Sequence, residues 1–302
     1  MKQNQKSKGA SHKLRSLTSL NQVEYAELYS VFDGLIKQKL SHYTLKGVKR
    51  KCRSYQEHSN SSLYGSDQKL RFILMYMKEN PNQSYHGEMF GLSQSKVSEW
   101  IYFLSPVLEQ SLSKLGYMPI MGDSVALTEV ASDYLLIDAT EREVPRRCDY
   151  KAQKAEYSGK KGMHTIKNLA LTNDQNQVLF LSHSFEGATH DKAIWNDSQI
   201  QLGDQPLLAD LGFLGIDKTH PTAMIPFKKP RNGALRETQK QINKALSRLR
   251  VRIEHVFAAI KRLKIIREKI RLKSYDIRDQ MMRIAAAIHN LRIDFRALRN
   301  HS

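Results

Sequence analysis

Two apolar runs that each end in an aspartate limit most strongly how this 302-residue chain can fold. Residues 134–137 lead directly into Asp138, and residues 206–209 lead directly into Asp210. Short apolar runs of this kind are typical of strands buried in a sheet. A carboxylate at the mouth of a core strand loses hydration unless it is paired or binds a metal. We therefore expect a central sheet in which the two aspartates emerge side by side at the same end.

The elements around these runs predict an α/β fold, with a mixed sheet and helices on its faces. The other strand-like segments are residues 164–171, 178–182 and 223–227. The polar loop 172–177 would join the first two as an antiparallel hairpin. The predicted helices cover residues 190–201, 235–264 and 276–298. In this order the Asp138 strand can lie centrally, and the Asp210 strand can pair beside it.

A third acid, Glu254, lies in the strongly basic helical stretch 248–257. Its helix has an apolar face and can cross the sheet end where the aspartates emerge. Oxygen ligands without a histidine or cysteine cluster are what Mg²⁺ prefers. We therefore predict that Asp138, Asp210 and Glu254 are catalytic and bind Mg²⁺ or Mn²⁺ as two ions about 3.5–4 Å apart. Because clustered carboxylates repel one another, one of them would have a raised pKa without cations.

Each acid also has a structural interpretation, in which it caps a turn or pairs with a neighbour. The neighbours would be Thr140 for the first aspartate, Gly212 for the second, and Arg250 or His255 for the glutamate. For any single acid this alternative is the stronger one. The three acids together, in this element order and in a basic chain, favour the metal site.

The net charge of +18 favours a polyanionic partner. Residues 228–273 hold 16 Lys and Arg against three acids, whereas a merely solvated helix face usually mixes its charges. An anionic membrane surface would also attract this charge. The longest apolar runs have four or five residues, far fewer than the ~20 that span a bilayer. We therefore expect nucleic acid as the partner and no membrane.

Two weaker features lie near the predicted site. Residues 157–162 form a flexible basic loop in which Lys160 and Lys161 could grip a phosphate backbone, although the spacing is not that of a P-loop. His190 and Asp191 open the helix 190–201, so they are candidate neighbours of the site. Capping of the helix explains them equally well.

A helix-turn-helix pattern precedes these elements, near residues 85–104. Gly91 would supply the positive φ of the tight turn, and Ser93 would cap the second helix. Leu92, Val97 and Ile101 would face the core. The polar residues left outside can reach base edges and phosphates, and they are Gln94, Ser95, Lys96 and Ser98. Similar corners occur in ordinary helical bundles, but the charge of the chain favours DNA binding.

The N-terminus and the cysteines indicate the compartment. Residues 1–20 are expected to form a basic disordered tail, since they are polar and lack the apolar region of a signal peptide. Cys52 and Cys148 have neither metal-ligand spacing nor a disulfide framework, so a reducing interior is expected. We therefore expect a cytoplasmic protein.

Five segments, in order, resemble the bacterial DDE insertion-sequence transposases, in particular insertion-sequence family five and its Harbinger-like relatives. The segments are residues 136–141, 157–167, 187–191, 209–215 and 252–261. The helix-turn-helix before them fits the same family. The resemblance implies a bacterial protein associated with the nucleoid. No single segment is decisive, but five in the family's order are specific.

The resemblance implies a ribonuclease-H-like catalytic core in which Asp138, Asp210 and Glu254 match the metal-binding triad. It places Arg252 and Lys261 among basic residues that contact DNA near the cleaved bond. The implied reaction is metal-dependent cleavage at the terminal inverted repeats of the element. Attack of the freed 3′-hydroxyl on target DNA would follow. The partners would be double-stranded DNA, as element ends and target, and further copies of the chain in a dimer or larger assembly.

Three parts are therefore expected: the tail, a helical DNA-binding domain over residues 21–125, and a ribonuclease-H-like domain over residues 130–302. Two other functions stay open. A domesticated DNA-binding regulator would keep the helix-turn-helix without catalysis, although the intact triad argues against it. A ribonuclease-H-like nuclease of repair or RNA turnover would fit the basic segment 228–273, but it would not need the N-terminal module.

Overall fold

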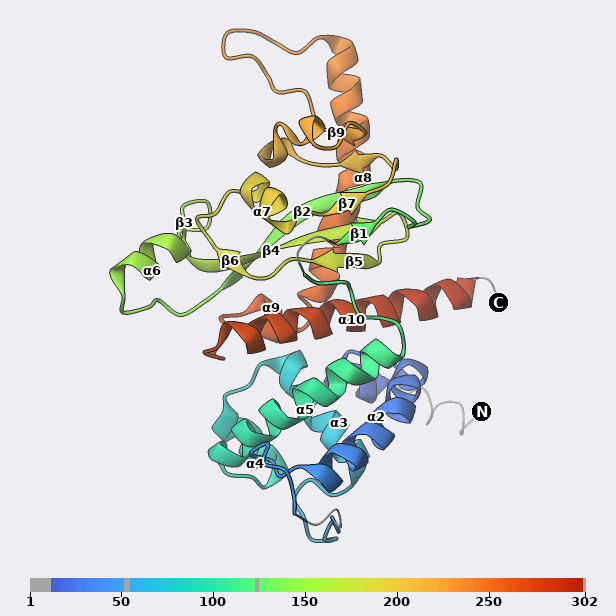
Figure 1. Ribbon diagram of the computed structural model, residues 1–302, viewed down its shortest axis with the longest axis vertical. Coiled ribbons are helices and arrows are strands. Elements are labelled where there is room, and N and C mark those ends of the chain that lie inside the picture. The colour runs from blue at the N-terminus through green and yellow to red at the C-terminus, as the bar shows by residue number, and fades with distance from the viewer. Residues whose placement is uncertain (1–11, 52–54, 123–124, 301–302) are drawn as a thin grey trace. The chain divides into compact units, whose positions relative to one another are not determined.

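A computed structural model describes residues 12–51, 55–122 and 125–300, and the chain divides into two compact units (Figure 1). Unit 1 comprises residues up to Met118, together with Lys261–Glu268 and Leu272 onward. Unit 2 comprises Pro119–Ile260 and Lys269–Arg271. The chain thus leaves unit 2 at the end of its last long helix.

Unit 2 is built on a mixed sheet in which β2 lies at the centre. The strand order is β3-β4-β2-β8-β9, and β5 and β6 also pair with β4. β4 runs antiparallel to β2, whereas β8 runs parallel to β2, and β9 runs parallel to β8. The strands are β2 (Leu135–Glu143), β3 (Tyr157–Ser158), β4 (Met163–Asn173), β5 (Val178–Leu181), β6 (Phe185–Glu186), β8 (Leu207–Leu208) and β9 (Ala223–Met224).

The register of β2 and β8 places the two aspartates at equivalent points. Leu136 pairs with Leu208 in parallel. Asp138 and Asp210 each follow their paired leucine by two residues, so they lie at the same level on neighbouring segments. Asp210 follows the end of β8, whereas β2 continues past Asp138 to Glu143, because this half of the strand pairs with β4. The prediction that Asp138 ends its strand is therefore wrong. The predicted central position of the Asp138 strand, with the Asp210 strand beside it, is confirmed.

The core of unit 2 explains why these strands form. Leu135, Ile137, Leu169 and Leu171 are at most 1% exposed, and they pack with Phe180 in one apolar cluster. Burial of each such side chain contributes about 1.5–3 kcal/mol. The sheet is therefore fixed by the burial of alternate residues of β2 and β4.

Helices cover the sheet, with bounds that differ from the expected ones. They are α6 (Tyr150–Glu156), α7 (Asp191–Ser198) and α8 (Glu237–Ile260), and β1 (Ala126–Leu127) pairs with β7 (Gln201–Leu202) in a small separate sheet. α7 stops earlier than predicted because Gln199 turns into the left-handed region at φ 46°. α6 has mainly polar residues and no apolar periodicity, so the sequence pattern did not predict it.

Unit 1 consists of helices, as expected for the N-terminal half. They are α2 (Gln22–His42), α3 (Gly65–Glu79), α4 (Gln83–Phe90), α5 (Gln94–Lys114), α9 (Lys264–Arg267) and α10 (Tyr275–Asn300). Asn21 and Glu24 form a capping box at the start of α2. The final helix groups with unit 1, although the sequence led us to place it in the second domain. The functional domain boundaries stay a prediction.

Two segments of unit 1 differ from the sequence expectation. Residues 12–18 are helical rather than part of a disordered tail, and Leu20 beyond them is fully buried; residues 1–11 lie outside the described part. α5 continues through Pro106 to Lys114, beyond the expected end near residue 104. Its continuation is stabilised because Val107, Leu108 and Leu112 are buried.

α4 and α5 form the predicted helix-turn-helix corner. Gly91 has φ 63° and ends α4, and the Ser93 hydroxyl accepts a hydrogen bond from the backbone of Lys96. Val97 and Ile101 are fully buried, whereas Leu92 is only half-buried. The two helices also meet closely at Gly87, where an added Cβ would lie 2.3 Å from the carbonyl oxygen of Leu92.

No helix in the described part of the chain combines the length and the apolarity that crossing a membrane requires.

Replacement of Gly87 by alanine is expected to destabilise unit 1 by about 1–3 kcal/mol, because the new methyl group must displace backbone. The matched control is Gly34→Ala within α2, where nothing lies within 4 Å of the added Cβ. That change should be neutral or stabilise by about 0.4–1 kcal/mol. Urea unfolding followed by circular dichroism measures both, and equal effects would contradict the close approach at Gly87.

Candidate active site

A pocket of about 340 Å³ in unit 2 collects all three predicted catalytic acids. Asp138 comes from β2, Asp210 follows β8, and Glu254 comes from α8. Glu141 and Asp191 line the same pocket. Five carboxylates from distant parts of the chain therefore face one small volume, which also contains the side chains of Lys160, Lys167 and Arg250.

Asp138 is the most strongly perturbed acid of the pocket. Burial raises the pKa of its carboxyl group to about 6, and the nearby negative charges of Asp210 and Asp191 act in the same direction. The backbone N–H of Ala139 donates to Oδ1 at 2.8 Å and, together with Arg250, partly opposes this rise in pKa. A bound cation would offset the repulsion between the carboxylates that Ala139 and Arg250 do not compensate.

Asp210 is held by the turn that follows β8. Its Oδ1 accepts a hydrogen bond of 2.7 Å from the backbone of Gly212, so the turn proposed as the structural alternative is present. An added Cβ on Gly212 would lie 2.9 Å from Asp210 Oδ1 and 3.3 Å from Asp191 Oδ2. The two carboxylates, one after β8 and one at the start of α7, thus approach the same glycine.

Glu254 and Arg250 lie one turn apart on α8 and both line the pocket. Glu254 is exposed. The Arg250 guanidinium is 3.9 Å from Asp210 Oδ2, and its buried Nε has no hydrogen-bond partner among the described residues. As the structural alternative to metal binding, Arg250 was expected to pair with Glu254, whereas its ion pair is with Asp210. Arg250 thus supplies positive charge beside two of the acids.

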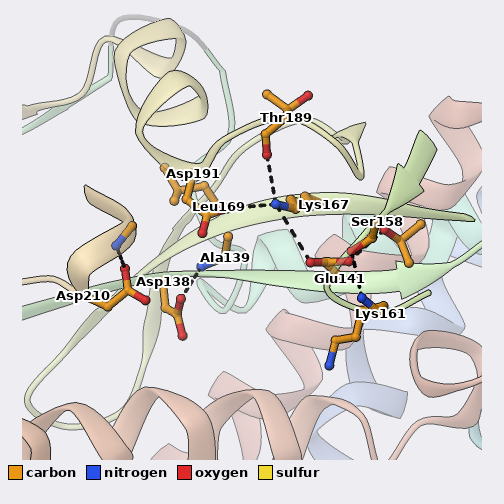
Figure 2. A network of polar contacts seen from close by, with 12 residues as sticks. Asp138, Ala139, Glu141, Ser158, Lys161, Lys167, Leu169, Thr189, Asp191 and Asp210 are labelled. Carbon is orange, nitrogen blue, oxygen red and sulfur yellow. Dashed lines mark hydrogen bonds and ion pairs between the residues drawn. The ribbon is translucent and has the colours of Figure 1, made fainter. Parts of the chain in front are cut away.

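Lys167 organises the other side of the pocket (Figure 2). Its ammonium group donates to Asp191 Oδ1 at 3.1 Å and to the carbonyl oxygen of Thr189 at 2.9 Å. It also lies 3.9 Å from Glu141, which it faces directly across β2 and β4. Asp191, predicted as a site neighbour, is therefore fixed in the pocket, and the exposed His190 lines it at the N-cap of α7.

The predicted DNA-contacting residues of unit 2 differ in their surroundings. Lys160 and Lys161 are exposed in the β3–β4 turn, and Lys160 lines the pocket. Arg252 is half-buried and donates to the hydroxyl of Tyr134, to the side chain of Asn176 and to a backbone carbonyl of the same turn. Its guanidinium thus joins α8 to the β4–β5 turn. A DNA contact by Arg252 stays a prediction.

The remaining predicted contacts lie in unit 1. Gln94, Ser95 and Lys96 are exposed in the first turn of α5, and Ser98 behind them is half-buried. Lys261 is half-buried directly after α8. These residues are not in the acidic pocket, so the structure brings together the acids and one basic loop but leaves the helix-turn-helix as a separate surface.

The donor set fits divalent cations, because the pocket offers carboxylate oxygens and a desolvated Asp138. The acids do not form a closed shell as they stand: within the described ranges, no three His, Cys, Asp or Glu side chains are close enough to hold one ion. Arg250 and Lys167 balance part of the negative charge instead.

Glu141 and Lys167 line the pocket although neither was predicted as a site residue, and Arg250 was predicted only as a partner of Glu254. Glu141 and Lys167 are directly opposite each other on antiparallel strands, which is a favourable position for opposite charges. That signal becomes visible only when the strand register is known. Arg250 precedes Glu254 by four residues, a spacing that places both on one face of a helix.

Replacement of Asp138 by asparagine is expected to stabilise the metal-free protein above about pH 6. The pKa of Asp138 is about 6 in the folded state, against about 3.9 in an unfolded chain. The folded state therefore binds more protons between these values, so stability falls as the pH rises from about 4 to 6. The substitution removes this loss, which is at most about 3 kcal/mol.

Chemical unfolding across this pH range, in the presence of a chelator, measures the effect. The matched control is Asp133→Asn, because Asp133 is exposed just before the same strand. An Asp138→Asn variant that is no more stable than this control at pH 7 would contradict the desolvation of Asp138.

Two family profiles match the chain. The profile described as "DDE superfamily endonuclease" matches residues 137–290, and "Helix-turn-helix of DDE superfamily endonuclease" matches residues 61–114. The first begins at the residue before Asp138 and includes all three acids. The second covers α4 and α5.

Two curated relatives are similar over most of the chain. The "Probable transposase for insertion sequence element IS702" of Microchaete diplosiphon is 29% identical over 74% of this chain and 80% of its own length. The "Putative transposase for insertion sequence element IS112" of Streptomyces albus G is 28% identical over 72% of this chain and 77% of its own length. No solved structure matches the chain significantly. Because the endonuclease profile covers about half of the residues, the chain belongs to the DDE superfamily of endonucleases.

Proposed function

We propose that this protein is the transposase of a bacterial insertion sequence, which binds the terminal inverted repeats, cleaves them and joins the freed 3′-hydroxyl to target DNA. The observation that carries the proposal is the pocket that gathers Asp138, Asp210 and Glu254 from three separate elements of a DDE endonuclease. The names of both relatives support transposition as the biological role. We further assign the element to insertion-sequence family five and its Harbinger-like relatives, from the resemblance of its motifs.

A ribonuclease-H-like catalytic core is part of this proposal. The strand arrangement supports it: a central β2 pairs antiparallel with β4 on one side and parallel with β8 on the other. This arrangement brings Asp138 within β2 beside the end of β8, where a substrate phosphate can reach both aspartates. The proposed catalytic domain covers residues 130–302, and the DNA-binding domain covers residues 21–125.

Asp138, Asp210 and Glu254 would hold two Mg²⁺ or Mn²⁺ ions, since carboxylates with open positions suit these cations. When bound, such ions supply the Lewis acidity that activates a water or 3′-hydroxyl and stabilises the leaving oxygen. Asp138 is the acid that gains most from a cation, because its carboxylate is the one that burial disfavours. Glu254, on a helix rather than at a strand end, can close on the aspartates from the open side.

Basic residues near the acids would orient the DNA. Lys160 and Lys161 are exposed in the turn beside the pocket and can hold the phosphate backbone. Arg250, next to Asp210, can contact the phosphate whose bond is broken. Arg252 and Lys261 would contact DNA near that bond, as the family resemblance implies.

The helix-turn-helix would supply recognition of the element end. Gln94, Ser95, Lys96 and Ser98 lie in the first turns of α5, the part of a recognition helix that meets base edges. Two element ends must be brought together for transposition. A dimer or larger assembly on double-stranded DNA is therefore part of the proposal.

A domesticated regulator and a nuclease of repair or RNA turnover are the competing functions. Intact acids in one pocket argue against the first, because a regulator has no need of them. The matched helix-turn-helix profile argues against the second, because it belongs to the same superfamily as the catalytic part.

Replacement of Asp138 by alanine, or of Glu254 by glutamine, is expected to lower Mg²⁺-dependent strand cleavage and strand transfer more than about 100-fold. Mutation of a residue that only hydrogen-bonds to a metal ligand lowers metal affinity or activity by about 10–100-fold, so loss of a ligand itself should have a larger effect. The substrate is a duplex that carries the inverted repeats flanking the reading frame, and labelled products are resolved on a denaturing gel. DNA binding should persist in both variants.

The matched control is Glu237→Gln, because Glu237 is an exposed acid in the first turn of α8. It should keep the activity of the parent protein. Full activity in the Asp138→Ala variant would exclude the proposed site. Normal repeat binding without metal-dependent nicking in the parent protein would favour the regulator.

A further inference from the structure

We propose that the segment after α2 is a second DNA-contacting element, a basic hairpin that binds the phosphate backbone beside the helix-turn-helix. The basic hairpin comprises residues 43–50. The inference rests on the proposed function, since it assumes that α5 binds DNA. It adds a surface that contributes affinity from a part of the chain outside the helix-turn-helix.

The basic hairpin is an ordered turn rather than a loose loop. Tyr43 and Lys49 form an antiparallel bridge. The backbone N–H of Thr44 donates to the carbonyl of Val48 at 2.9 Å, and that of Gly47 donates back to Thr44 at 2.9 Å. Gly47 has φ 77°, a conformation that glycine adopts without strain. The tip therefore has a fixed shape.

Arg50 anchors the basic hairpin to unit 1. Its Nε donates to the carbonyl oxygens of Leu40 at 2.9 Å and of Tyr43 at 3.2 Å. Its backbone N–H donates to His42 at 2.7 Å, and its guanidinium lies 4.9 Å from the ring centre of Tyr55. Because these contacts use the guanidinium of Arg50 to hold the hairpin in place, the lysines are the residues that can contact a partner.

Lys46 and Lys49 carry the charge of the tip. Both are exposed, and neither forms an ion pair with an acid of the described residues. Val48 between them is 63% exposed, which makes the tip a projecting element rather than part of a packed surface. Two unpaired ammonium groups on a rigid turn suit a partner with regularly spaced negative charges, such as the phosphates of duplex DNA.

The basic hairpin shares one cleft with the start of α5. The cleft has a volume of about 570 Å³, and it is lined on one side by Leu45, Lys46 and Gly47 and on the other by Gln94, Ser95 and Ser98. Glu99 also lines the cleft, but its carboxylate is paired with Lys96 at 2.7 Å. Lys46, at the tip of the hairpin, thus lines the same cleft as three of the predicted base-contacting residues.

This arrangement matches the shape of a duplex. A helix in the major groove, which is about 12 Å wide, has a phosphate backbone along each edge of the groove. An element that projects beside the N-terminal turn of α5 would meet one of these backbones. Because phosphate contacts carry no sequence information, the hairpin would increase affinity for any duplex, while α5 would discriminate between sequences.

The test compares the full chain with a Lys46→Gln/Lys49→Gln variant on a mixed-sequence duplex of roughly 30 base pairs. Binding is measured by fluorescence anisotropy over a series of salt concentrations. Log affinity falls as log salt rises, and each lost phosphate contact makes this slope shallower by about 0.9. The slope of the variant should therefore be shallower than that of the parent by about 1.8. A Lys46→Arg/Lys49→Arg variant keeps the charge and should keep the slope of the parent.

The matched control is Lys13→Gln/Lys114→Gln, which removes the same charge from two other exposed lysines of unit 1. Lys114 ends α5, about 30 Å along the helix from Gln94. Lys13 precedes α2, whereas the hairpin follows it. The control should keep the slope of the parent. Far-UV circular dichroism checks that all variants are folded.

Each outcome separates the inference from the proposed function. A parent protein that binds the duplex, with equal slopes in the hairpin variant and the control, would overturn the hairpin contact alone. Absence of duplex binding by the parent would overturn both the proposed function and this inference. A loss of slope confined to the hairpin variant supports both.

Discussion

The parallel pairing of β2 with β8 is the interaction on which the site depends. Two pairs of leucines fix the register, and an aspartate lies two residues beyond the second leucine of each pair. A shift by one residue would turn one aspartate toward the apolar core, where an unpaired carboxylate is strongly disfavoured. The same leucines are fully or almost fully buried, so the packing that stabilises the sheet also sets the distance between the two acids.

α8 contributes one acidic and one basic side chain to the site, beside the two aspartates that come from the sheet. Its apolar face, with Ile253, Val256 and Ile260 buried, fixes its rotation. Glu254 and Arg250 then line the acidic pocket, while Arg252 contacts the β4–β5 turn. Arg252 lies two residues from both Arg250 and Glu254, which is about 200° around the helix, so its side chain has a different role from theirs.

The sequence was sufficient for the parts of the fold that apolar periodicity determines. It predicted the central strand, the adjacent strand with Asp210 and the helix-turn-helix corner at Gly91. It did not predict α6, which is capped by Asp149 and has no apolar periodicity. It also did not predict the continuation of α5 through Pro106, which depends on burial against the rest of unit 1. The contacts of Lys167 depend on the register of β2 and β4, and those of Arg250 depend on the rotation of α8 about its axis. Neither quantity can be read directly from a single sequence.

The ladders on the two sides of β2 differ greatly in length. β4 pairs with β2 along all nine residues from Leu135 to Glu143, whereas β8 pairs with it at two positions. Local opening needs the fewest broken contacts where the ladder is short, so the Asp210 segment has a lower opening free energy than the Asp138 segment. We therefore expect the Asp138 half of the candidate site to be the more rigid one, and the Asp210 half to be ordered when a ligand binds. A ligand that contacts both halves must order the Asp210 half when it binds, and this costs part of the binding free energy. The apparent affinity of the ligand is then lower than its intrinsic affinity by the fraction of free protein in which both halves are already in place.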